Sequence, residues 1–198
     1  MESVCGYQAS VLLLYCVDTN RMGDLASHLG QPYAMDPAWM CTTGAVDTVM
    51  AAQTAAIAAR SLGLDYLFTN GIHRGDPQRV FTTLELPERD CLPLVALLLG
   101  YSAKERGPRK GRWCGPGIIH HGRYQRLTRD ERNAQVAAYD DPHQNLGLNQ
   151  VWRDKGCAHY LEFLFTQWCR PFDAGKQPPS AMTTILRRQG FIHAAPVA

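Results

Sequence analysis

The tripeptide Lys110-Gly111-Arg112 places two cations two residues apart in a stretch that is rich in glycine and proline. Proline biases the chain before it towards extended backbone, and in an extended chain residues i and i+2 project from the same face. Lys110 and Arg112 could therefore meet one phosphate dianion, the arginine through its planar fork and the lysine as a point charge. A solvated basic loop is the alternative, because three further basic residues lie nearby.

A second group, Phe68-Thr69-Asn70-Gly71, stands at the end of a short apolar stretch, Tyr66 to Thr69, that predicts a strand. Ligands of α/β proteins favour the carboxyl ends of strands, and glycine lets the backbone approach a flat ring. We therefore take Phe68, Thr69, Asn70 and Gly71 as candidates for contact with a planar ligand. The alternative is an ordinary turn that ends the strand, and Asn-Gly is a common signal for one.

The pair His120-His121, with Cys114 nearby, raises the question of a metal site. Adjacent residues of a strand point to opposite faces, and no second ligand pair stands at a spacing typical of zinc, so we predict no metal ligand. The sequence also contains no Ser/His/Asp or Cys/His nucleophile pattern, no G-x-G-x-x-G and no P-loop. This absence fits a protein in which a bound cofactor carries the chemistry.

Composition limits the remaining classes. A length of 198 residues, 45% hydrophobic and 19% charged, suits one soluble domain over residues 1–198, and a net charge of +2 gives no reason to expect nucleic acid as a partner. The seven cysteines are odd in number and scattered, which predicts reduced thiols and a cytoplasmic protein. The apolar run Val11 to Val17 is too short to span a membrane.

The first half of the chain alternates between strand and helix patterns, which predicts a three-layer α/β core. Two continuous apolar runs predict fully buried strands. Of two predicted helices, the first ends at a glycine and the second follows a capping aspartate. A loop around Pro37 and Trp39 separates the first helix from an alanine-rich stretch. The predicted strands are Val11–Val17, Tyr66–Thr69 and Leu92–Gly100; the helices are Arg21–Leu29 and 77–84, capped by Asp76; the loop is Tyr33–Thr43.

Ala45 to Leu62 is the clearest helix of the sequence, with seven alanines and a stop at Gly63. Apolar residues lie all round it and charges are few, so we expect it to be buried on most of its surface, in the centre of a domain or at a dimer seam. After Gly100 the stretch Ser102–Gly117 predicts a loop or an extended arm. Three helices should follow it: Thr128–Tyr139, which has a capping box with Glu131, Trp152–Trp168, and Ser180–Gln189.

The order of several fragments resembles one known family. The fragments are Gly44-Ala45-Val46-Asp47, Ala51-Ala52-Gln53, Asn70-Gly71-Ile72, Leu84-Glu85-Leu86-Pro87, Lys110-Gly111-Arg112, Ile118-Ile119-His120-His121-Gly122-Arg123-Tyr124 and Leu186-Arg187-Arg188-Gln189-Gly190-Phe191. Together with the strand that ends at Gly100, they look like the core and C-terminal half of the FMN-dependent nitroreductases. The resemblance is greatest to the major oxygen-insensitive, NADPH-preferring branch, and it covers Val11 to Phe191.

The resemblance implies an α/β (α+β) fold in which helices flank a mixed sheet, and a homodimer formed through the long alanine-rich helix. It implies FMN as cofactor and NAD(P)H as electron donor. A nitroaromatic, quinone or flavin would be the acceptor, in a ping-pong mechanism. It assigns the FMN phosphate to Lys110 and Arg112, and the ring edge to the Phe68–Gly71 turn. Asn70 replaces the first of two family glycines there, and because asparagine tolerates positive φ the turn can survive.

The sequence also departs from the family in one respect. Its members usually begin with an Arg-Ser-x-Arg segment and a first strand that grip the flavin, and this sequence starts after them. We therefore interpret it as a single nitroreductase-like domain, truncated at the N-terminus, that retains FMN poorly. The alternative function is a non-catalytic or flavin-poor remnant that acts as a dimer scaffold or partner. A nucleic-acid binder with a basic loop is a more distant possibility.

Overall fold

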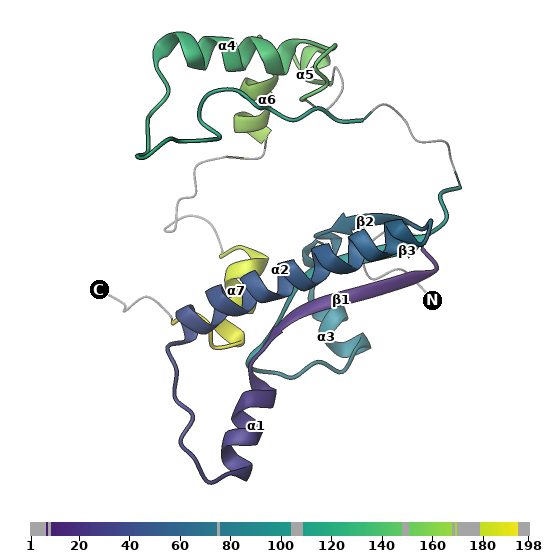
Figure 1. Ribbon diagram of the computed structural model, residues 1–198, viewed down its shortest axis with the longest axis vertical. Coiled ribbons are helices and arrows are strands. Elements are labelled where there is room, and N and C mark those ends of the chain that lie inside the picture. The colour runs from purple at the N-terminus through teal and green to yellow at the C-terminus, as the bar shows by residue number, and fades with distance from the viewer. Residues whose placement is uncertain are drawn as a thin grey trace. The chain divides into compact units, whose positions relative to one another are not determined.

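The chain folds into two units, which the computed structural model describes over residues 7, 9–74, 76–103, 109–147, 151–167, 169 and 179–193 (Figure 1). The first unit comprises residues 1–103 and 178–198, and the second comprises residues 104–177. Each unit is described by itself below. The single domain over residues 1–198 stays a prediction.

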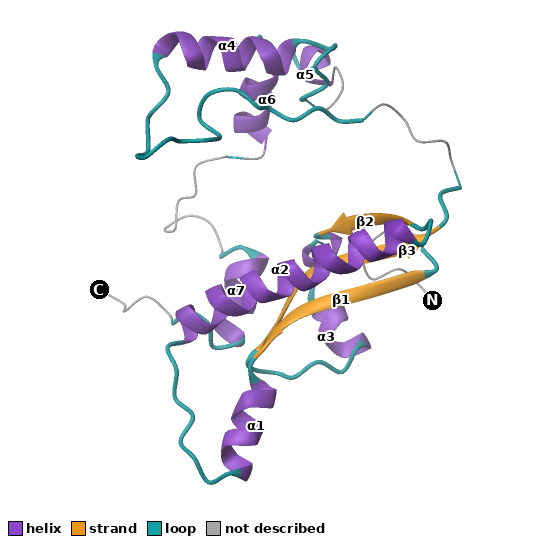
Figure 2. Ribbon diagram, in the orientation of Figure 1, coloured by secondary structure: helices purple, strands orange, loops and turns teal. Residues whose placement is uncertain are grey.

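Three strands form the sheet of the first unit: β1 (Val11–Asp18), β2 (Asp65–Thr69) and β3 (Cys91–Gly100). Their order is β1-β3-β2, and both ladders are antiparallel (Figure 2). The mixed sheet that we expected is therefore antiparallel throughout the described strands. Central β3 has a neighbour on each edge and is mostly buried, as predicted, whereas β1 lies at an edge and buries only Val17. The prediction that β1 is fully buried is wrong, because its partner covers one edge alone.

Helices cover both faces of this sheet. Helix α2 (Pro37–Ser61) packs along all three strands on one face. On the other face the short 3₁₀ helix η1 (Gly71–His73) and helix α3 (Gln78–Thr83) insert Ile72 and Val80 between strand residues. The strand residues of this cluster alternate along β1 and β3, as one face of a sheet requires: Leu12, Leu14, Ala96 and Leu98. The α/β (α+β) class and the helix–sheet–helix layering are confirmed.

Helix α2 begins earlier than we expected, so the predicted loop over Tyr33–Thr43 is wrong from Pro37 onwards. Asp36 caps the helix, accepting a hydrogen bond of 2.7 Å from the Trp39 amide, and Pro37 occupies the first turn. Proline lacks the amide hydrogen that would be unpaired there, so the residue that suggested a loop is a helix-start signal.

One face of α2 lies on the sheet and the opposite face is exposed. Ala52, Ala56 and Ala59 are buried on the inner face. The outer face carries a stripe of large apolar side chains at helical spacing, each more than half exposed: Trp39 (63%), Val46 (54%), Met50 (56%) and Ile57 (60%). The expectation that most of the helix surface is buried is therefore wrong for the single chain.

Helix α7 (Ala181–Arg188) returns to the sheet from the end of the chain, and Ser180 caps it. The residue after it, Gln189, is fully buried. Its side-chain oxygen accepts from the Cys91 amide (2.9 Å), and its side-chain nitrogen donates to the Pro87 carbonyl (3.3 Å). Helix α1 (Asn20–His28), in contrast, buries no residue. Both helices were predicted to within two residues of their ends.

The second unit contains α4 (Arg129–Asp140), α5 (Val151–Asp154) and α6 (Tyr160–Gln167). The capping box of Thr128 with Glu131 at the start of α4 is confirmed, with both reciprocal hydrogen bonds present. The single helix expected over Trp152–Trp168 is wrong. The chain turns at Gly156, where φ is +71°, and this left-handed conformation ends α5. Trp168 itself lies outside the described residues.

None of the described helices is both long enough and apolar enough to cross a membrane. The six described cysteines are free, and Cys5 lies outside the described residues. Contact with Cys91, followed by burial, raises the pKa of the Cys16 thiol above its usual range, and burial raises the pKa of the Cys41 thiol. Both groups are therefore poor nucleophiles at neutral pH.

We expect Gln189→Ala to destabilise the first unit by about 1–3 kcal/mol, because it leaves the buried Cys91 amide without an acceptor. Urea unfolding measures the loss, and hydrogen exchange should show faster exchange of the Cys91 amide. Arg187→Ala is the matched control, because Arg187 is exposed in the same helical turn. Equal unfolding free energies for the two variants would contradict this role of Gln189.

Candidate functional site

The segment that carries Lys110 and Arg112 is held by one asparagine of the second unit. The Gly111 amide donates to the Asn145 carbonyl (2.8 Å), and the Asn145 side-chain nitrogen donates to the Arg109 carbonyl (2.7 Å). Asn145 adopts a φ of +48°, a left-handed conformation that asparagine tolerates better than most residues. The two hydrogen bonds fix the backbone on both sides of Lys110.

Gly111 lies where only a glycine fits. A Cβ atom at this position would stand 2.0 Å from the Gln144 carbonyl oxygen and 3.2 Å from Cδ2 of the buried Leu146. The backbone of the 141–147 loop therefore presses directly against the residue between the two cations. This close approach explains why the residue between Lys110 and Arg112 is a glycine.

The Lys110 and Arg112 side chains are exposed, and neither forms an ion pair with a described residue. The Arg112 guanidinium turns back on its own chain, where Nη1 donates to the carbonyls of Lys110 (3.3 Å) and Gly111 (3.0 Å). Its Nε and Nη2 groups make no hydrogen bond to a described residue. Two cations on a fixed backbone, with guanidinium donors to spare, suit a phosphate group.

The Phe68–Gly71 group lies in the first unit, where β2 passes into η1. Asn70 precedes the 3₁₀ helix with φ −97° and ψ 18°, so the positive φ that we considered for it is not used. The Gly71 amide donates to Thr69 Oγ1 (2.9 Å), which closes the turn internally. Phe68 and Thr69 are half-buried, whereas Asn70 is exposed. The side chain of Asn70 is therefore the polar group that this turn presents to solvent.

The structure thus brings Phe68, Thr69, Asn70 and Gly71 together at one turn of the first unit, and Lys110 and Arg112 together in one segment of the second. Sequence reasoning missed Asn145, the residue that positions the cations. An asparagine shortly after Asp141-Pro142 is a turn signal, but nothing in the sequence names Arg109 and Gly111 as its partners.

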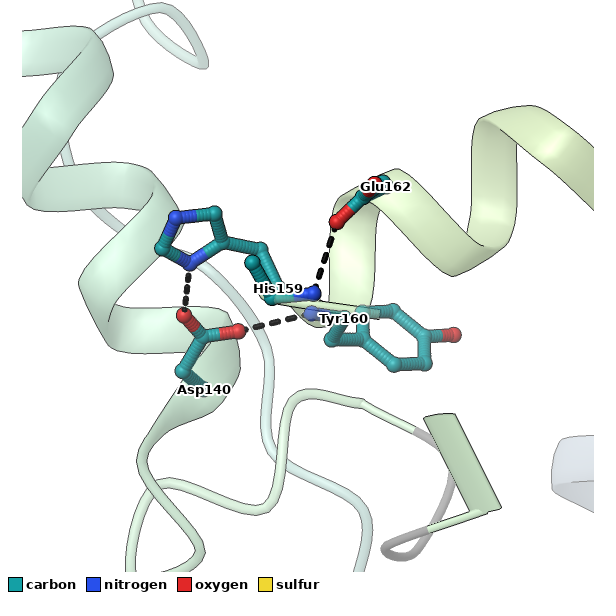
Figure 3. A network of polar contacts seen from close by, with 5 residues as sticks. Asp140, His159, Tyr160 and Glu162 are labelled. Carbon is teal, nitrogen blue, oxygen red and sulfur yellow. Dashed lines mark hydrogen bonds and ion pairs between the residues drawn. The ribbon is translucent and has the colours of Figure 1, made fainter. Parts of the chain in front are cut away.

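A polar network that the sequence did not reveal joins α4 to α6 (Figure 3). Asp140 Oδ2 lies 2.6 Å from His159 Nδ1, and Asp140 Oδ1 accepts from the Tyr160 amide (2.8 Å). Glu162 accepts from the Ala158 amide (2.7 Å). The two carboxylates therefore satisfy amides at the start of α6, and the stacked rings of Tyr139 and Tyr160 cover the junction. This network docks α6 on α4.

His120 packs against a neighbouring ring and accepts one hydrogen bond. Its ring packs on Tyr124, with ring centres 4.6 Å apart, and its Nδ1 accepts from the Gln125 amide (3.2 Å). Across the part of the chain that the structure describes, no three His, Cys, Asp or Glu residues are grouped as metal ligands.

No protein-family model matches the chain. The chain is 36% identical over 138 residues to the FMN reductase (NAD(P)H) of Bacillus subtilis strain 168, covering 68% of this chain and 53% of that protein. It is 35% identical over 136 residues to the oxygen-insensitive NADPH nitroreductase of Salmonella typhimurium, covering 68% and 51%. The chain therefore spans about half the length of the curated relatives it matches.

Solved structures share the fold. The hypothetical oxidoreductase YcnD from Bacillus subtilis superimposes with a TM-score of 0.68 at 28% identity, over 93% of this chain and 70% of that one.

We expect Gly111→Ala to lower the stability of the second unit by on the order of 1–3 kcal/mol, because the added Cβ forces the 141–147 loop away. Amides of residues 109–114 should then exchange hydrogen faster. Gly23→Ala is the control: its Cβ would meet the Tyr33 ring at an ordinary 3.6 Å, and alanine is the better helix former. Unchanged exchange in Gly111→Ala would show that the close approach does not hold the segment.

Proposed function

This chain belongs to the nitroreductase family, and we propose that it acts in a flavin-dependent oxidoreductase that takes electrons from NAD(P)H. The support is its identity to an FMN reductase (36%) and to an NADPH nitroreductase (35%). Because the chain spans about half of each relative, the activity of the whole protein is itself part of the proposal. The cofactor that we propose is FMN.

Lys110 and Arg112 would hold the FMN phosphate. The observation that carries this assignment is the anchored backbone between them, which Asn145 fixes on both sides of Lys110. A phosphate group prefers donors that are already in place, because ordering two long side chains on a mobile loop costs entropy. Neither cation is neutralised by a described carboxylate, so both charges remain available.

The Phe68–Gly71 turn would border the flavin ring, with weaker support. The Gly71 amide already donates to Thr69 Oγ1, whereas the exposed Asn70 side chain is a donor that this turn can offer. When bound, FMN supplies the two-electron chemistry, and this chain's part is to bind and orient it. No catalytic side chain is proposed.

We propose a ping-pong order in which NAD(P)H leaves before a nitroaromatic, a quinone or a free flavin binds. Initial rates at several concentrations of both substrates test the order, because a ping-pong mechanism gives parallel double-reciprocal lines. Intersecting lines would exclude the order while leaving the oxidoreductase assignment intact. A cytoplasmic location is part of the same proposal, supported by the free cysteines.

The second candidate function is a flavin-poor scaffold or partner subunit. The internal closure of the Phe68–Gly71 turn favours it, because the Gly71 amide is not free to meet a ring. Flavin content of the purified chain separates the two functions. Stoichiometric FMN, visible as a yellow protein, supports the oxidoreductase. A colourless chain that takes up no added FMN supports the scaffold.

We propose that the chain forms a homodimer through α2. The exposed apolar stripe of Trp39, Val46, Met50 and Ile57 supports this, because soluble proteins rarely leave such a continuous apolar surface in water. Ala56 is not part of the proposed seam, since it packs fully buried on the sheet side of its own chain.

If Lys110 and Arg112 bind the phosphate, Lys110→Gln or Arg112→Gln should weaken FMN binding by roughly 1.5–3 kcal/mol, about ten- to a hundredfold. Riboflavin, which lacks the phosphate, should lose much less. Titration by flavin fluorescence measures both constants. Arg109→Gln, an exposed neighbour, is the control and should leave both unchanged. Equal losses for FMN and riboflavin would refute the assignment.

The dimer is tested by placing a charge in the apolar stripe. Met50→Lys or Ile57→Glu should convert the dimer to a monomer in analytical ultracentrifugation, because an unpaired charge cannot be buried without a large desolvation cost. Ala134→Lys, on the exposed side of α4, should leave the assembly unchanged. A wild-type chain that is a folded monomer at micromolar concentration, or a dimer insensitive to both charges, would rule out this interface.

A further inference from the structure

A second surface of the first unit, away from the residues assigned above, carries a cavity. A cavity of about 540 Å³ lies among α3, the loop that precedes β3, and α7, and two arginines line it, Arg89 and Arg188. Sites for small molecules are commonly between about 300 and 1,000 Å³, so the cavity is of adequate size. Neither arginine forms an ion pair with a described residue.

Arg188 is held in a fixed position. Its guanidinium lies over the ring of the buried Phe81, 4.2 Å from the ring centre, and its Nη1 donates to the Gln78 side-chain oxygen. Stacking on an aromatic face and a hydrogen bond to α3 restrict a side chain that would otherwise sample many rotamers. The charge is therefore presented to the cavity with little further loss of entropy on binding.

The Arg89 guanidinium occupies space that a glycine leaves open. A Cβ atom on Gly190, where φ is +81°, would stand 2.8 Å from Nη2 of Arg89, so the absent side chain leaves the space that the guanidinium fills. The group also lies at the carboxyl end of α7, where the helix dipole favours a cation. Two separate features of the fold thus place two cations at one cavity.

The remaining lining defines the ligand. Phe81, a member of a buried cluster, and Leu86, which is partly buried and packs against that cluster, give the cavity an apolar lining. Glu88 also lines it, so two arginines and one glutamate leave a net charge of +1, which matches a monoanion better than a dianion. We propose that this cavity binds a small aromatic monocarboxylate, with the carboxylate between Arg89 and Arg188 and the ring against Leu86, beside the Arg188–Phe81 stack.

Benzoate is the probe, titrated into the full chain at low ionic strength by isothermal calorimetry. Arg89→Gln and Arg188→Gln should each weaken binding about tenfold or more, the effect of losing one charge-assisted hydrogen bond. Arg187→Gln is the matched control, because it removes the same charge from the preceding position of α7. Arg187 does not line the cavity, so its substitution should leave the affinity within about twofold.

Glu88→Gln should increase the affinity for benzoate severalfold, a change that a folding defect cannot produce. Its preference for benzoate, a monoanion, over phenyl phosphate, a dianion, should become smaller than that of the wild-type chain. Benzamide, which carries no charge, should not bind. Thermal melting checks that Arg188→Gln still folds, and Arg89→Gln and Glu88→Gln carry the test if it does not. The proposal is overturned by the absence of saturable benzoate binding, by equal losses in Arg187→Gln and Arg188→Gln, or by weaker binding in Glu88→Gln.

Discussion

The buried amide of Gln189 is the contact on which the first unit depends. Its side chain satisfies the first amide of the central strand and a carbonyl of the preceding loop, and its backbone carbonyl accepts from the Asp90 amide. Buried polar groups are costly unless they are paired, so these hydrogen bonds favour the docking of the residue that follows α7 against the start of β3. That arrangement brings Ile185 and Phe191 into the cluster with Val17 and closes the core.

Asn145 has the corresponding role in the second unit, but it acts on a segment proposed for function. A left-handed asparagine and a glycine with no room for a side chain set the backbone between Lys110 and Arg112. The backbone between the two charges is therefore set by Gly111 and by Asn145, a neutral residue more than thirty positions away. If this segment binds phosphate as proposed, a substitution that relaxes the 141–147 loop should lower both stability and phosphate affinity.

Local sequence signals predicted most elements of the fold because each depends on neighbouring residues. The Thr128 capping box and the continuous apolar run of β3 appear where they were expected. The predictions were wrong where one residue type is compatible with two local structures, or where the burial of a strand depends on partners distant in the sequence. Pro37 starts a helix instead of belonging to a loop, and β1 has the pattern of a buried strand but occupies an edge.

The sequence by itself determined the kinds of chemistry available: two cations at i and i+2, a turn after a strand, and no nucleophile or metal pattern. Only the tertiary structure decided which donors are free. It anchors the Gly111 amide to Asn145, pairs the Cys91 amide with Gln189, and sets Arg89 beside Gly190. The physical reason is that the availability of a polar group depends on hydrogen bonds and close approaches between residues far apart in the chain, and residue spacing carries no record of them.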